Sequence, residues 1–129
     1  MSRSSRASNP SAAELDRAAL DAIRALDEGG AAGLLQQVVQ LYLESVPPLI
    51  AELRRAGAAG DASAVRNAAH SLKSSSANLG AARLAEMCRA VEHAARAGRL
   101  GGDLPSVDEI EHEFRALRPA LEREAGLAL

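Results

Sequence analysis

The sequence predicts an all-α protein, an antiparallel four-helix bundle with a short additional helix on its N-terminal side. Alanine dominates the composition, and aromatic residues make up only 2% although hydrophobic residues make up 47%. Such a composition suits closely packed helices and suits strands poorly. Apolar residues also recur at helical spacing in five segments. Four segments have apolar faces of comparable length and a fifth has a short one, which favours a helix bundle. Periodicity alone does not determine the topology of that bundle.

The N-terminal part of the chain is expected to form a tail followed by one short helix. Residues 1–12 lack periodicity and are interpreted as a flexible tail or linker, or as a start-site or cloning remnant. The remainder, residues 13–125, has the length of one domain. A helix is expected over residues 14–27, and Gly29-Gly30 ends it. Its apolar stripe consists of Leu15, Ala19, Ile23 and Leu26.

The next helix is expected over residues 32–56 and contains two adjacent prolines. Pro47 and Pro48 each remove a backbone donor and crowd the preceding turn. Because the apolar phase continues across them, a single kinked helix is predicted, with two shorter helices as the alternative. Residues 57–60 form a short connection, so the following helix should run antiparallel to this one.

A third helix is expected over residues 61–81, with Asp61 as its N-cap. Its buried face is marked every seven residues by Val65, Leu72 and Leu79. His70 lies about 140° from Val65 around this helix. The imidazole should therefore face water or a partner.

Two further helices are expected in the C-terminal half. The first follows Gly80, and Cys88 on its inner face is interpreted as a small core residue rather than a nucleophile or ligand. After a loop rich in glycine, the last helix begins near Ser106, with Glu109 placed to complete a capping box. Pro119 should bend or fray the end of that helix.

The residues that flank His70 on its helix face are small, whereas exposed helix faces usually carry long charged side chains. These small neighbours are Ser63, Ser74, Ala77 and Ala81. Another surface could therefore approach the ring closely. Lys73, the one lysine in the sequence, follows one turn after His70 and is near enough to reach an anion on the imidazole. His93 and His112 lack such surroundings and are interpreted as ordinary exposed side chains.

The segment from His70 to Gly80 resembles the signature of histidine-containing phosphotransfer (HPt) domains. That signature is a histidine, any residue, an apolar residue, a lysine and a glycine, followed by small residues up to an apolar residue and a glycine. Its positions are occupied here by His70, Leu72, Lys73, Leu79 and Gly80. Ser74 stands where the family usually has glycine, and because serine is also small, access to the ring should survive. The resemblance extends over about residues 14–99.

The resemblance implies a function in a bacterial two-component phosphorelay. His70 would accept a phosphoryl group from the aspartate of a receiver domain and pass it to the aspartate of another receiver, while Lys73 would offset charge on the phosphoryl oxygens. The partners would be receiver domains of response regulators or of a hybrid histidine kinase. Magnesium would belong to the receiver, so this chain is expected to hold no cofactor or metal. It is also expected to have no ATP-dependent kinase activity of its own.

A docking face for the receiver is predicted around His70, on the exposed side of the same helix. Arg66 and Lys73 are its cations, suited to an acidic pocket on the receiver. The predicted face consists of Ser63, Arg66, Asn67, Ser71, Ser74, Ala77, Asn78 and Ala81.

Other functions stay open at this level. The chain could be a helical adaptor that binds a receiver without carrying phosphate, or the phosphoacceptor domain of a chemotaxis-type histidine kinase. The dimerisation domain of a sensor kinase fits poorly, because that family places an acidic residue after the histidine and this chain has Ser71. The sequence also leaves open which receivers are cognate, and whether this is a free protein or part of a hybrid kinase.

Charge and hydropathy argue against several classes of partner. The net charge of −2 creates no strong field for nucleic acid. No apolar run approaches 18 residues, so no membrane span is predicted, and the first residues do not form a signal peptide. The histidines and the single cysteine lack metal-ligand spacing. One cysteine fits a reducing compartment, so a cytoplasmic protein is expected, and the family resemblance implies a monomer.

Overall fold

The computed structural model describes residues 15–27 and 33–127, and over these ranges all regular structure is α-helical. The helices are α2 (Arg17–Leu26), α3 (Leu34–Ala59), α4 (Ala62–Asn78), α5 (Ala82–Arg96) and α6 (Val107–Glu124). The predicted tail and the glycine pair predicted to end the first helix lie outside the described residues. No helix within those ranges is long and apolar enough to cross a bilayer.

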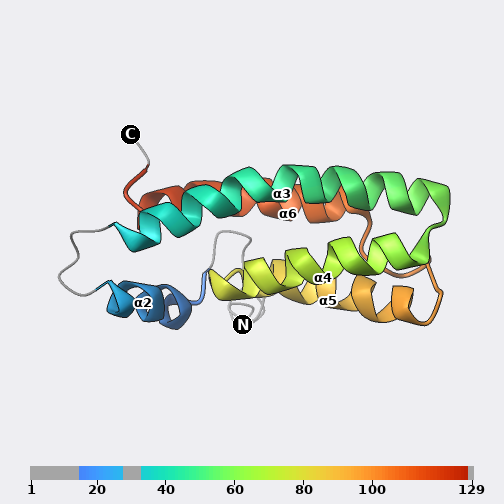
Figure 1. Cartoon of the computed structure of the whole chain (residues 1–129), viewed down its shortest axis with the longest axis horizontal. Helices are drawn as coiled ribbons and strands as arrows, with labels where there is room; N and C mark the ends of the chain where they lie inside the picture. The colour runs from blue at the N-terminus through green and yellow to red at the C-terminus, as the bar shows by residue number, and fades with distance from the viewer. Residues whose placement is uncertain (1–14, 28–32, 128–129) are drawn as a thin grey trace, which may run out of the picture.

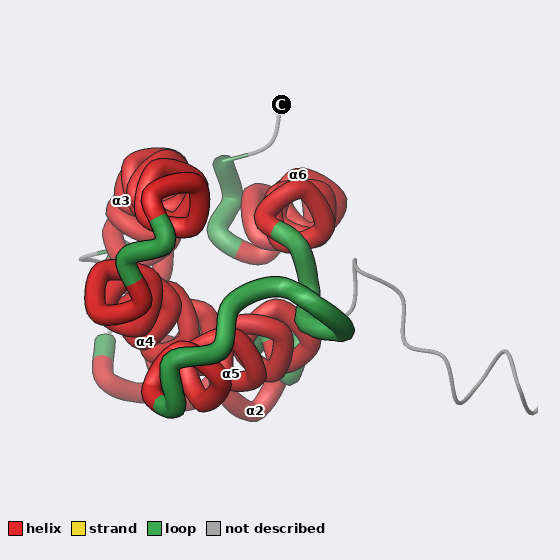
Figure 2. Tube along the Cα trace, turned by 90° about the vertical axis from the view of Figure 1, so that its right-hand side faces the viewer, coloured by secondary structure: helices red, strands yellow, loops and turns green. Residues whose placement is uncertain are grey.

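The four longer helices form two layers. Helices α3 and α6 lie in one layer, and α4 and α5 lie in the other (Figure 1). The view along the bundle shows the four helices around a shared interior (Figure 2). Each packs against its neighbours in the chain, and α6 returns to pack on α3, which gives an up-down-up-down topology. Helix α2 lies at one end and contacts α3 and α4, so the predicted bundle with an additional N-terminal helix is confirmed.

Two helix starts follow directly from local sequence. The carboxylate of Asp61 accepts a hydrogen bond from the backbone N–H of Ala64 at 3.1 Å. At the start of α6, the Ser106 hydroxyl accepts from the Glu109 N–H at 3.0 Å, and the Glu109 carboxylate accepts from the Ser106 N–H at 2.8 Å. Both predicted caps are confirmed, and each satisfies backbone donors that the first helical turn leaves free.

The prolines do not divide their helices. Helix α3 runs unbroken through Pro47 and Pro48, as the continuous apolar phase predicts. Both prolines are exposed on the outer side of the helix. Pro119 also lies inside a helix, because α6 continues to Glu124. The prediction that α6 frays at Pro119 is therefore wrong, whereas a bend at this residue stays a prediction.

The core is mainly aliphatic, and at its centre it also holds an aromatic pair and a pair of hydrogen-bonded hydroxyl groups. Tyr42 and Phe114 pack edge to face, with ring centroids 5.9 Å apart. The Tyr42 hydroxyl shares a hydrogen bond of 2.8 Å with the buried hydroxyl of Ser76, so neither group is left without a partner. Burial raises the pKa of the Cys88 thiol to about 12, which agrees with its interpretation as an inert core residue.

Helix α2 is held by polar contacts as well as by its apolar side. Leu26, predicted to belong to its apolar stripe, is 75% exposed, and that prediction is wrong. Burial of the helix centres on Leu20, and Leu26 lies about 120° from Leu20 around the helix axis. Arg17 and Arg24 both bond to the carboxylate of Glu124 on α6, at 2.9 and 2.8 Å. These contacts tie α2 to the far end of the chain.

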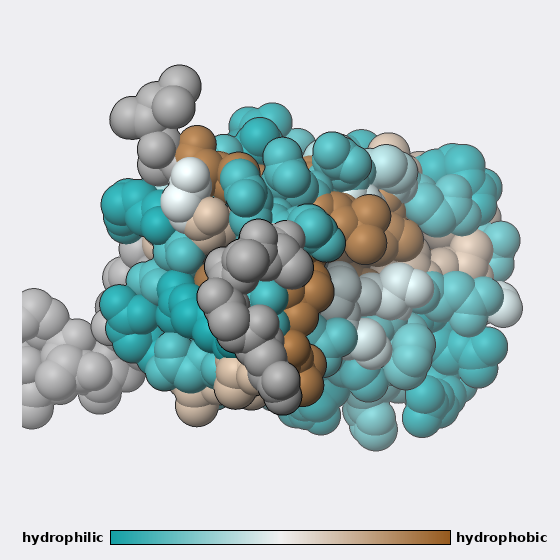
Figure 3. Space-filling view, turned by 60° about the vertical axis from the view of Figure 1, so that its left-hand side comes forward, coloured by the Kyte–Doolittle hydropathy of each residue, from teal (hydrophilic) through white to brown (hydrophobic). Residues whose placement is uncertain are grey.

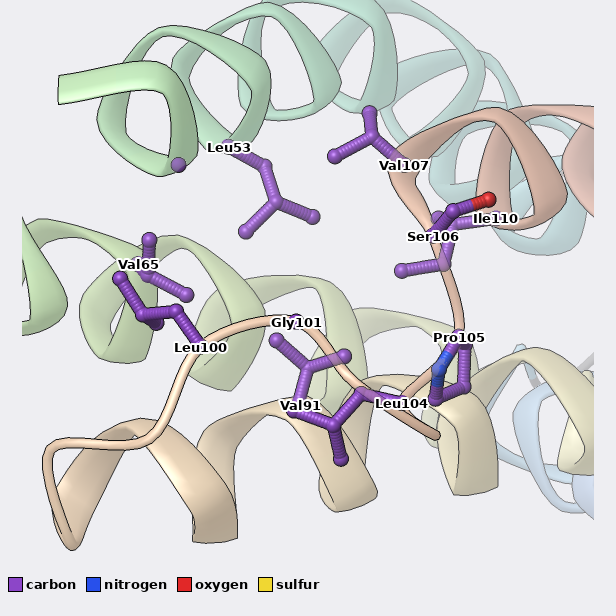
Figure 4. A pocket seen from close by; sticks show the side chains of 11 residues that line it. Leu53, Val65, Val91, Leu100, Gly101, Leu104, Pro105, Ser106, Val107 and Ile110 are labelled. Atoms are coloured by element: carbon purple, nitrogen blue, oxygen red, sulfur yellow. The ribbon is translucent and has the colours of Figure 1, made fainter. Parts of the chain in front are cut away.

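The two ends of the bundle differ. The surface at the α2 end is mainly hydrophilic, with separate hydrophobic patches (Figure 3). At the other end, the loop between α5 and α6 covers an apolar pocket of about 280 Å³ (Figure 4). Each of the four long helices contributes to its lining, through Leu53, Val65, Val91 and Ile110. His70 does not line this pocket.

Candidate functional site

His70 lies on the outer side of α4, where its side chain is 58% exposed. The helix presents the imidazole outward because Val65 and Leu72 are buried on its opposite side. This is the orientation that helical spacing predicts. The ring is therefore accessible, but it is not isolated.

One ring nitrogen contacts a buried carboxylate on the neighbouring helix. His70 Nδ1 lies 2.8 Å from Oε2 of Glu92 on α5, and the Glu92 side chain is only 6% exposed. Glu92 also receives Lys73 Nζ on Oε1 at 2.7 Å and Arg96 Nη2 on Oε2 at 3.1 Å. We call these four residues, His70, Lys73, Glu92 and Arg96, the Glu92 cluster.

The cluster determines which ring nitrogen of the neutral histidine carries the proton. The hydrogen bond from Lys73 lowers the pKa of Glu92; burial opposes this shift and the hydrogen bond from His70 adds to it. Glu92 is therefore ionised at neutral pH, and an ionised carboxylate only accepts hydrogen bonds. Nδ1 must then carry the proton of the neutral ring. The lone pair is left on Nε2, on the other side of the imidazole.

The turn between α4 and α5 places Glu92 level with His70. Helix α4 ends at Asn78, and Gly80 adopts a left-handed conformation with φ of 77° before α5 begins at Ala82. So short a turn makes the two helices antiparallel neighbours. Residues at equal distances from the turn then lie opposite each other, because each helix rises by the same amount per residue.

Gly80 also makes a close backbone contact. A Cβ at this position would lie 2.5 Å from the carbonyl oxygen of Asp16 and 2.9 Å from its nitrogen. The Asp16 N–H donates to the Gly80 carbonyl at 2.8 Å. The glycine that ends the signature segment is therefore required both by its conformation and by the approach of the chain that enters α2.

Most of the predicted docking face is accessible. The exposed members are Ser63, Asn67, Ser71, Ser74, Ala77 and Asn78. Arg66 is half-buried. Ala81 is 1% exposed, so its placement on this face is wrong. The physical reason is that α4 stops at Asn78, and the chain has already turned inward at Ala81, the N-cap of α5.

The surroundings of Lys73 differ from the expected exposed cation. Its side chain is 30% exposed, and its ammonium already contacts Glu92. Sequence reasoning found Lys73 but missed Glu92 and Arg96, which come from another helix. A signal for Glu92 exists in its spacing, because it lies four residues after Cys88 and three before Ala95, both of which are buried. A carboxylate on that face indicates a buried polar contact.

The described part of the chain contains no group of three or more histidine, cysteine, aspartate or glutamate side chains that could hold a metal ion. The site is thus a single accessible imidazole, one protonated nitrogen held by a buried carboxylate, and two cations on the same carboxylate. On a four-helix bundle, this arrangement presents one accessible ring nitrogen at the surface, a group that can act as a nucleophile.

Comparison with known proteins agrees with this chemistry. The family model described as Hpt domain matches residues 37–120, and the chain belongs to this family of histidine-containing phosphotransfer domains. The fold is similar to the crystal structure of histidine-containing phosphotransfer protein B (HptB) from Pseudomonas aeruginosa PAO1, with 29% sequence identity and a TM-score of 0.76. That similarity covers 89% of this chain and 96% of HptB. No match is found among curated protein sequences. Histidine phosphotransfer in a phosphorelay is thus the function of this chain.

Proposed function

We propose that His70 is the phosphoacceptor, that it takes a phosphoryl group from the aspartate of one receiver domain, and that it passes the group to the aspartate of another. One observation carries this proposal: the exposed imidazole has its Nδ1 on an ionised, buried carboxylate. The other nitrogen, Nε2, then has a free lone pair, which nucleophilic attack on phosphorus requires.

The transfer step needs no further reactant. The Nε2 lone pair attacks the phosphorus of the receiver's acyl phosphate, a P–N bond forms, and the P–O bond breaks with its electron pair on the aspartate carboxylate. The ring then carries a proton on Nδ1 and a positive charge, which the Glu92 carboxylate offsets at 2.8 Å. A positively charged ring is a good leaving group, so a second receiver aspartate can take the phosphoryl group by the reverse step.

Lys73 has two tasks in this scheme. Its ammonium neutralises part of the Glu92 charge, which keeps the buried carboxylate ionised. It is also one turn from His70 and can offset charge on the phosphoryl oxygens as a single point charge. In this proposal magnesium is held by the receiver, and this chain supplies the accepting nitrogen and the cations beside it.

The receiver would dock on the exposed small residues around His70. Ser71, Ser74 and Ala77 leave the imidazole approachable, and Arg66 adds a cation for an acidic receiver pocket. The proposal places the protein in the bacterial cytoplasm, as a monomer, with receiver domains of response regulators or of a hybrid kinase as partners.

The test is phosphoryl transfer from labelled receivers. A panel of receiver domains carrying ³²P-phosphate is mixed with the wild-type protein, with His70→Gln and with the matched control His112→Gln, which changes an exposed histidine on α6. Label should appear on the wild type and on His112→Gln, be lost in acid, and be absent from His70→Gln. Circular dichroism should show that all three are equally folded. Equal labelling of both variants would refute the assignment.

A further inference from the structure

The contacts of Glu92 are unequal, and one of them is easily exchanged. Lys73 is 30% exposed and bonds to Oε1 at 2.7 Å, whereas Arg96 is 63% exposed and bonds to Oε2 at 3.1 Å. An ion pair whose cation is mostly in water contributes little to stability, so the contact of Arg96 is the weaker one. Arg96 also lies one turn after Glu92 on α5, and its flexible side chain can reorient without moving the helix.

Arg96 is close to the ring that receives the phosphoryl group. Arg96 Nη2 and His70 Nδ1 both bond to Oε2 of Glu92, so these two nitrogens lie within about 6 Å of each other. A guanidinium carries five N–H donors, and it binds phosphate oxygens through two parallel hydrogen bonds. The contact with Glu92 uses Nη2 and leaves other donors of Arg96 for a second acceptor.

The charge of the site changes when the group arrives. Before transfer, one carboxylate faces two permanent cations, Lys73 and Arg96. A phosphoryl group adds close to two negative charges and three acceptor oxygens beside the ring. The negative charge of Glu92 is then balanced by one cation fewer, because the ring that it contacts has become positively charged.

We infer that Arg96 is a phosphoryl-binding residue that exchanges partners during the relay, an inference that rests on the proposed role of His70. When His70 is unmodified, Arg96 bonds to Glu92. When His70 carries the phosphoryl group, the guanidinium moves to the phosphoryl oxygens, while Lys73 keeps its contact with Glu92 and acts on the phosphoryl oxygens only as a nearby point charge. The exchange stabilises the phosphorylated form of this protein relative to the phosphorylated receiver, and it reverses when the group leaves.

The experiment measures how the label divides between receiver and this protein at equilibrium. Wild type, Arg96→Gln and Arg96→Lys are each incubated with one ³²P-labelled receiver that labels the wild type. The matched control is Arg115→Gln, because Arg115 makes the same i,i+4 contact of 3.1 Å with Glu111 on α6. Arg96→Gln should shift the equilibrium toward the receiver by roughly three- to tenfold, Arg96→Lys by less, and the control not at all.

A second readout separates binding of the phosphoryl group from a structural effect on the cluster. The ¹⁵N chemical shifts of the unphosphorylated His70 ring should be the same in wild type and Arg96→Gln, because Glu92 still accepts from Nδ1. In the wild type, the Arg96 Nε–H signal should move on phosphorylation of His70. An unchanged equilibrium in Arg96→Gln, or an Arg96 signal that does not respond, would overturn the inference while leaving the labelling of His70 intact. Failure of the wild type to take label would instead overturn the role of His70.

Discussion

Replacing Gly80 by alanine tests how the start of α2 is joined to the turn between α4 and α5. The added methyl group would lie 2.5 Å from the Asp16 carbonyl oxygen and 2.9 Å from the Asp16 nitrogen, and both are backbone atoms. Neither can move aside as a flexible side chain would. The chain entering α2 must shift, and the 2.8 Å hydrogen bond from the Asp16 N–H to the Gly80 carbonyl is lost or weakened.

Three costs add in this variant. A φ of +77° costs an alanine about 1 kcal/mol, overpacking against fixed atoms costs about 1–3 kcal/mol, and a lost backbone hydrogen bond costs about 1 kcal/mol. Gly80→Ala should therefore lower the free energy of unfolding by about 3–5 kcal/mol. Gly60→Ala is the matched control, because Gly60 has a φ of +69° and no atom within 4 Å of the added methyl group. Gly60→Ala should lower the free energy of unfolding by only about 1 kcal/mol.

Urea denaturation followed by circular dichroism measures both variants. With a slope of about 1–3 kcal/mol per molar urea, the difference between them corresponds to a midpoint lower by about 1 M or more. Hydrogen exchange should also quicken in α2 of Gly80→Ala and stay unchanged in α2 of Gly60→Ala. If the two variants unfold at the same midpoint, the close approach of Asp16 to Gly80 is wrong.

Three further changes test the site and the core. Lys73→Ala should slow phosphoryl uptake by His70 about tenfold or more, measured as the initial rate of labelling, because a cation beside the phosphoryl oxygens is lost; a melting temperature that collapses would contradict the expectation that the fold is kept. Glu92→Gln should lower the free energy of unfolding by about 1–3 kcal/mol near neutral pH, since hydrogen bonds to a charged group are lost. The pKa of Glu92 is lowered in the folded state from 4.5, so its stabilisation is present above that pH and declines as the pH falls through the folded value. Urea titrations at a series of pH values should therefore show the two proteins converging in acid, and a constant difference would contradict the pKa shift. Thiol reagents should modify Cys88 only in urea, since its pKa is about 12 in the folded protein.

The local features of this fold could be predicted from the sequence. Asp61 and Ser106 begin helices because each side chain satisfies a backbone donor within three residues of itself. The uninterrupted α3 could also be predicted, because its apolar phase is the same on both sides of Pro47-Pro48. These predictions depend on residues close to one another in the chain, and no tertiary contact overrides them.

The errors at Leu26 and Ala81 share a different cause. Leu26 has the right spacing for a core residue, but a ten-residue helix at the end of a bundle is buried only where a neighbour reaches it. Ala81 has the right spacing for the exposed face of α4, but α4 has already ended. In both cases helical periodicity was extended past the point where the surrounding structure supports it. Periodicity describes which residues share a face, and it does not say how far that face extends.

Glu92 shows how a tertiary contact can be inferred from one correctly placed turn. His70 and Glu92 are the same number of residues away from Ala81, one before it and one after it. In an antiparallel pair of helices with a short turn, such residues lie at the same height, because both helices rise equally per residue. Placing the turn at residues 79–81 would have singled out the positions near 92 as the height opposite His70. Of these, Glu92 is the ionisable residue on the face defined by Cys88 and Ala95. A carboxylate is rarely buried without a partner, so the burial that this face imposes on Glu92 requires donors from the opposite helix. At that height α4 offers His70 and, one turn on, Lys73, and these are the residues that Glu92 contacts.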